Sequence, residues 1–127
     1  MYFVKRLQSC DDYMALGGVL QSEIKHAESA LGVCFAKDYK EYLLQCGVAT
    51  ADGHEFTGIC NSKRLNVVDV TLKQKRSVDS LPIGAYVIEE THIDDIVIWQ
   101  VENGSIYQSK GIDSVVKIYN NLCQYMK

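Results

Sequence analysis

The sequence lacks the cysteine spacing of a disulfide framework or a zinc site. Its five cysteines stand apart, no Cys-x-x-Cys pair occurs, and an odd number of them cannot all form bridges within one chain. The N-terminus lacks the order of a signal peptide, because its charged residues follow the apolar ones. No apolar run approaches the roughly 20 residues that a membrane helix needs. These absences predict a soluble protein of a reducing cytoplasm.

Motifs of several enzyme and nucleic-acid-binding classes are missing as well. The sequence has no glycine-rich phosphate loop, no Gly-x-Ser-x-Gly nucleophile elbow and no stripe of interleaved basic and aromatic residues. The net charge of -3 argues against a general binder of the phosphate backbone and tilts the expectation toward a basic partner. We therefore expect no cofactor, no direct contact with nucleic acid and no enzymatic activity.

Two small groups of residues leave a chemical role open. Asp52, His54 and Glu55 lie beside a turn and could form part of a hard-metal or hydrolytic site, but such a trio is more often a solvated loop. Cys34 or Cys60 could act as a nucleophile only with a base close in space, whereas buried cysteines are usually inert. No histidine has a second His or Cys at a metal-ligand spacing, so we expect no metal.

Residues 81–108 predict three consecutive antiparallel strands. Asn103-Gly104 lies between runs rich in β-branched and aromatic residues and predicts a two-residue type I′ turn, since both residues tolerate a positive φ. The strands beside such a turn have a fixed register. One face would then carry Val97, Trp99, Val101 and Ile106.

Helical patterns surround this sheet. We expect a short helix within residues 2–16, a helix with Ser22 as N-cap and Gly32 after its end, a helix from about Lys37 to Cys46, and a terminal helix over residues 113–127. Residues 54–60 alternate as a short strand, and residues 66–72 suit either a strand or a helix capped by Asn66. The expected fold is α+β in a single domain, residues 1–127. Its antiparallel sheet has about four to six strands, flanked by an N-terminal helix pair and a C-terminal helix.

The order of these motifs resembles the SUKH superfamily, which includes a yeast cell-wall-assembly regulator and many bacterial immunity proteins. The resemblance rests on Ala-Glu-x-x-Leu-Gly-Val within residues 27–33, on Asp-Tyr-Lys-Glu-Tyr-Leu-Leu at residues 38–44, and on the later strand and turn motifs up to residue 127. Where the family usually has Leu-Pro before the Asp-Tyr, this chain has Phe35-Ala36-Lys37. The resemblance implies that residues 66–72 are helical.

Acidic residues concentrate in the expected loops. If loops at one edge of the sheet converge, they form a negative surface that steers a basic partner; the alternative is that loops are simply polar in a mildly acidic chain. The candidate partner-binding residues are Asp52, Glu55, Glu89, Glu90, Asp94, Asp95 and Glu102. Trp99 and Tyr107 would be anchors if exposed, although the apolar neighbours of Trp99 favour the core.

The resemblance implies a non-enzymatic protein-binding module of the bacterial cytoplasm. Under the first interpretation it is an immunity protein that neutralises a cognate toxin, often a nuclease, by occluding the toxin's active surface. Under the alternative it is a regulatory or scaffolding domain for an endogenous protein, with no toxin involved.

Overall fold

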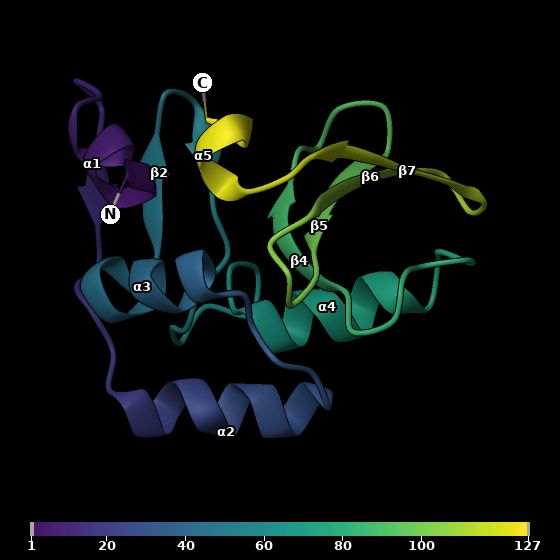
Figure 1. Ribbon diagram of the computed structural model, residues 1–127, viewed down its shortest axis with the longest axis horizontal. Coiled ribbons are helices and arrows are strands. Elements are labelled where there is room, and N and C mark those ends of the chain that lie inside the picture. The colour runs from purple at the N-terminus through teal and green to yellow at the C-terminus, as the bar shows by residue number, and fades with distance from the viewer. Residues whose placement is uncertain (1, 127) are drawn as a thin grey trace.

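The computed structural model describes residues 2–126 and shows five helices and two antiparallel sheets (Figure 1). In chain order the elements are α1 (Tyr2–Gln8), β1 (Met14–Ala15), α2 (Gln21–Leu31), α3 (Lys37–Cys46), β2 (Ala49–Ala51), β3 (His54–Glu55), α4 (Val67–Lys75), β4 (Tyr86–Glu90), β5 (Ile96–Gln100), β6 (Ile106–Lys110), β7 (Ser114–Tyr119) and α5 (Leu122–Tyr125). The α+β class expected from the sequence is confirmed.

The two sheets stand beside each other (Figure 1). The smaller has the strand order β1-β2-β3 and the larger the order β4-β5-β6-β7. Figure 1 shows α3 and then α2 below the smaller sheet, α4 below the larger one, and α5 between the two. The larger sheet, with four strands, has the size that the sequence predicts. No helix within residues 2–126 is long and apolar enough to cross a membrane.

Buried tyrosines join α3 to both sheets. The Tyr42 hydroxyl donates to the Thr57 carbonyl at 2.8 Å and accepts from the Ala49 amide at 3.0 Å. The Tyr86 hydroxyl of β4 accepts from the amide of Ala36, the N-cap of α3, at 2.8 Å and donates to Gln100 Oε1 at 2.7 Å. Because these buried hydroxyls are all hydrogen-bonded, the rings fill the core without an unsatisfied polar group.

Both faces of the larger sheet are covered. On one face, Tyr86, Ile88, Ile98 and Ile106 join the core that contains α3. On the other face, Trp99 packs with Val70 of α4 and donates from its indole nitrogen to Ser109 Oγ at 2.9 Å. Trp99 is fully buried, as its apolar neighbours in the sequence indicate.

The predicted register of the β5–β6 hairpin is wrong by one residue. Trp99 lies opposite Tyr107, and the Val101 amide donates to the Ser105 carbonyl at 3.2 Å. Gly104 has a φ of 99°, whereas Asn103 has no positive φ, so the connection is a three-residue loop ending in a glycine bulge instead of a type I′ turn. A shift of one residue exchanges the faces of the second strand, so Ile106 lies opposite to the predicted face.

The predicted terminal helix over residues 113–127 is also wrong. Residues Ser114–Tyr119 form β7, which pairs with β6, and within residues 2–126 only the short helix α5 follows. Lys127, the end of the predicted helix, lies outside the described residues. Val115, Ile118 and Tyr119 suit a helical stripe, but the β-branched residues of this segment suit a strand equally. Pairing with β6 decides between the two, because it satisfies the backbone groups of β7 that face β6 and the groups of β6 that β5 leaves free.

The short helix expected within residues 2–16 is confirmed as Tyr2–Gln8. Two smaller predictions near the N-terminal half need correction. Leu20, not Ser22, is the N-cap of α2, because the Glu23 carboxylate accepts from the Leu20 amide at 2.8 Å. The strand predicted for residues 54–60 covers only His54–Glu55, because the chain then turns to β4.

Other predicted helix ends are confirmed. Gly32 follows α2 in the left-handed conformation, and α3 spans Lys37–Cys46. The Asn66 side chain caps α4 by accepting from the Val68 amide at 3.0 Å. The alternative of a strand over residues 66–72 is thereby excluded.

Candidate functional site

Loop 91–95, between β4 and β5, carries two exposed carboxylates on an ordered backbone. Asp94 and Asp95 have φ angles of 52° and 61°, a conformation uncommon for residues other than glycine. Thr91 supports the loop, because its hydroxyl donates to the Ile96 carbonyl at 2.7 Å. Neither aspartate forms an ion pair within residues 2–126. Both charges are therefore available to a partner without any rearrangement of the loop.

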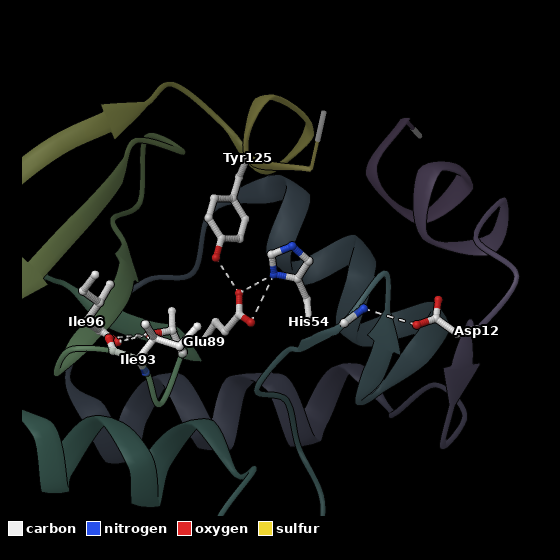
Figure 2. A network of polar contacts seen from close by, with 8 residues as sticks. Asp12, His54, Glu89, Ile93, Ile96 and Tyr125 are labelled. Atoms are coloured by element: carbon white, nitrogen blue, oxygen red, sulfur yellow. Dashed lines mark hydrogen bonds and ion pairs between the residues drawn. The ribbon is translucent and has the colours of Figure 1, made fainter.

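Glu89 of β4 is buried and fully engaged. His54 Nδ1 donates to its two carboxylate oxygens at 2.8 and 3.1 Å, and the Tyr125 hydroxyl donates to the same carboxylate. Figure 2 shows the three side chains converging from β4, β3 and α5. Only 5% of Glu89 is exposed, so it ties these elements together and cannot reach a protein partner.

The contact with Glu89 changes the acid–base properties of its two donors. The hydrogen bond to Glu89 raises the pKa of His54 above its ordinary value, because it favours the charged imidazolium, while partial burial opposes the rise. Burial, reinforced by the nearby Glu89 charge, raises the pKa of Tyr125, so its phenol stays protonated. The cluster is therefore an ion pair with a neutral donor when His54 is protonated.

Two more of the predicted acidic residues are paired within the fold. Arg64 donates through both terminal nitrogens to Glu55, at 2.9 and 3.2 Å, and this hydrogen bonding lowers the pKa of the Glu55 carboxyl. Lys73 Nζ lies 2.9 Å from a Glu90 oxygen, which also accepts from Gln74. These charges are largely compensated, so they add little to a negative surface.

Asp52 lies at a different place, in the turn between β2 and β3. Its amide and that of Gly53 donate to the Asp12 carboxylate at 2.7 and 3.2 Å. These two bonds lower the pKa of Asp12. The Asp52 side chain is exposed, in a pocket that it shares with Asp11 and Asp12.

Glu102 lies at the opposite end of β5 from loop 91–95. The seven intervening steps of extended chain correspond to roughly 20 Å. Glu102 is exposed beside a pocket of about 280 Å³ that Asp38 and Glu41 also line. Asp38 has a structural role there, because its carboxylate accepts from Gln100 Nε2 at 2.9 Å and from the Leu122 amide at 3.0 Å.

The seven candidate residues therefore do not converge on one edge. Asp94 and Asp95 share a loop, whereas Asp52 and Glu102 stand apart from it and from each other. Of the two proposed anchors, Trp99 is buried and Tyr107 is half-buried against the same cluster. Ile93, by contrast, lies beside the two loop aspartates with 63% of its surface exposed.

The residues that could have formed a metal or hydrolytic site bind other partners within the fold. Glu55 pairs with Arg64 and His54 with Glu89, so the trio with Asp52 does not form a common site. No group of three or more potential metal-ligating side chains occurs within residues 2–126. No serine or cysteine in that range hydrogen-bonds to His54.

Four residues that hold these loops and side chains in position were not predicted from the sequence. Asp12, Asp38, Arg64 and Tyr125 each bind a group far away in the chain. Their partners lie between 9 and 84 positions away, so no local spacing signals the contact. Only Asp38 stood within a motif quoted for the family resemblance.

Comparison with known proteins gives one family and no individual relative. The model of the family SUKH_6, described as SMI1-KNR4 cell-wall, matches residues 21–126. A search of curated proteins found no match. The matched range contains every strand of the larger sheet and the helices that cover it. With a match over most of its length and the α+β fold that the resemblance implies, this chain belongs to the SMI1-KNR4 family of the SUKH superfamily.

Proposed function

We propose that this protein is a non-enzymatic immunity protein that binds and neutralises a cognate bacterial toxin in the cytoplasm. The observation that carries the proposal is the family match over residues 21–126, because membership of this family fits a protein-binding module. The toxin would be a basic protein, such as a nuclease, whose surface complements the net charge of -3.

Loop 91–95 is the surface that we propose to contact the partner. It combines two uncompensated carboxylates, Asp94 and Asp95, with the exposed apolar side chain of Ile93. An apolar contact flanked by charges is typical of interface centres with a polar rim. Because Thr91 already holds the loop, binding orders little additional backbone and loses little entropy.

A nuclease toxin explains why acidic groups would serve this function. Such enzymes bind a phosphate backbone through Lys and Arg side chains. Carboxylates presented on a rigid loop offer the same charge to those cations, which accelerates association and blocks the substrate site. Rim charges act mainly on the association rate, and salt screens them.

The alternative is a regulatory or scaffolding domain for an endogenous protein. The words "cell-wall" in the description of the matching family favour this alternative, since they refer to a process and not to a toxin. Under it, the same loop would contact a cellular partner.

The experiment is a capture assay with the product of the neighbouring gene. The test variant is Asp94→Asn, Asp95→Asn, because asparagine keeps the tolerance for positive φ while removing both charges. Asp11→Asn, Asp79→Asn removes two exposed charges elsewhere and is the matched control. We expect salt-sensitive capture of a toxin, with an association rate that falls by roughly tenfold in the test variant only.

The interface at loop 91–95 and the immunity function can each be contradicted separately. Capture that is equal in both variants places the interface away from loop 91–95 while retaining the immunity function. Capture of cellular proteins only, with no protection of cells against the neighbouring gene product, supports the regulatory alternative instead.

A further inference from the structure

Strand β7 forms an uncovered edge of the larger sheet. It is the last strand in the order β4-β5-β6-β7, and no strand within residues 2–126 pairs with its outer side. At six residues it is the longest strand described. Val116 and Tyr119 are 51% and 39% exposed on it. An open edge of this kind exposes unpaired amide and carbonyl groups and is a template for another strand.

The opposite edge of the same sheet is covered, which shows that the open edge is specific to β7. The Val87 amide of β4 donates to the side chain of Thr71 in α4, at 2.9 Å from Oγ1, and not to a strand. Thr57 donates to the carbonyls of Val87 and Ile88 at 2.8 and 2.9 Å. Helix α4 and the chain after β3 therefore satisfy backbone groups of β4, whereas no such hydrogen bond from within residues 2–126 reaches the outer side of β7.

The two charged residues at β7, one acidic and one basic, can pair with those of a second copy. Lys117 is the only charged residue of the strand, and Asp113 immediately precedes it. Neither forms an ion pair within the described part of the chain. If two copies of β7 pair antiparallel with Val115 at the two-fold axis, Asp113 of each copy lies opposite Lys117 of the other.

Other symmetric registers lack this compensation. Centring the pair on Val116 sets Lys117 opposite Val115, and centring it on Lys117 sets two like charges together. Every register centred on a residue pairs residues of like backbone orientation, so the charge compensation is what distinguishes the register centred on Val115. The turn before β7 is already fixed, because the Asp79 amide donates to the Ile112 carbonyl at 2.6 Å.

We propose that the protein forms a symmetric dimer through antiparallel pairing of β7 with β7 of a second copy, in the register that sets Asp113 against Lys117. The pairing joins two four-stranded sheets into one continuous sheet. It spans five residues of each copy, about 16 Å of strand, and covers Val116 of both copies. Figure 1 shows that the β6–β7 hairpin extends away from α1 and α2.

The test is sedimentation of the full chain at low ionic strength as a function of concentration. Lys117→Asp and Asp113→Lys each set two pairs of like charges across the interface, and we expect each to weaken the dimer by roughly tenfold or more. Lys63→Asp, in an exposed loop far from β7 in the chain, is the control and leaves the dimer unchanged. Both positions on the edge are exposed, and circular dichroism verifies that the variants fold.

Mixing the two single variants is the decisive step. In the mixed dimer each reversed charge meets an opposite charge, so association returns to the wild-type level, and only contact between two chains can produce this recovery. A wild-type chain that stays monomeric overturns the proposal, as does a dimer that neither reversal weakens or that mixing does not restore.

Discussion

Replacing Tyr125 by phenylalanine tests whether the Glu89 cluster fastens α5 to the sheets. The change removes one hydroxyl that donates to the buried Glu89 carboxylate. It retains the ring, whose centroid lies 5.5 Å from that of His54 and 6.3 Å from that of Phe56. Hydrogen bonds to charged groups contribute about 1.5–3 kcal/mol. We therefore expect a loss of about 2 kcal/mol in the free energy of unfolding, and a fall of roughly 8 °C in Tm at this chain length.

Urea denaturation followed by the fluorescence of Trp99 measures this loss. Tyr119→Phe is the matched control. The ring centroid of Tyr119 lies 6.0 Å from that of Tyr125, but the Tyr119 hydroxyl makes no hydrogen bond to the described residues. The control should change the free energy by less than about 0.5 kcal/mol. Equal small effects of both variants would refute the idea that the buried hydroxyl stabilises the fold.

Two further predictions concern pH and close backbone contact. Because Glu89 raises the pKa of His54 above 6.5, the stabilisation from protonated His54 is fully present below that value and disappears as pH rises through the folded pKa. Denaturation of wild type and His54→Gln should differ most at acidic pH, and a difference that grows toward alkaline pH contradicts the sign. Gly58→Ala places a Cβ 1.7 Å from the Gly47 carbonyl oxygen, so the backbones must separate, and we expect a loss of roughly 3 kcal/mol or more in urea denaturation. Gly53→Ala has open space and only backbone strain, so it should lose about 1 kcal/mol, and equal losses would contradict the packing argument.

Local signals explain which elements the sequence could predict. Gly32 ends α2 and Asn66 begins α4 because the cap depends on one residue and its immediate neighbours. The segment 114–119 had no such signal, since its apolar residues suit both a helix and a strand. The hairpin at Asn103-Gly104 was located correctly, but its loop length, and hence its register, depends on the φ of a single residue.

The acidic surface depended on contacts that sequence alone does not contain. Glu55, Glu89 and Glu90 look like free loop charges, yet Arg64, Tyr125 and Lys73 reach them through the fold. Only Asp94 and Asp95 remain together and uncompensated. Glu102 lies far from loop 91–95 because consecutive hairpins place their turns at alternate ends of a sheet.

The carboxylate of Asp38 links the beginning of the chain to its end, and this has a consequence for synthesis. Its two donors lie 62 and 84 positions later, so α3 is made long before Gln100 and Leu122 leave the ribosome. At about 5–20 residues per second, the interval between residues 38 and 122 is roughly 4–17 s. During it, the larger sheet that packs against α3 through Tyr86, Ile88, Ile98 and Ile106 is incomplete. We therefore expect the nascent chain to require chaperones until α5 emerges, and a truncation before Leu122 to prolong this dependence.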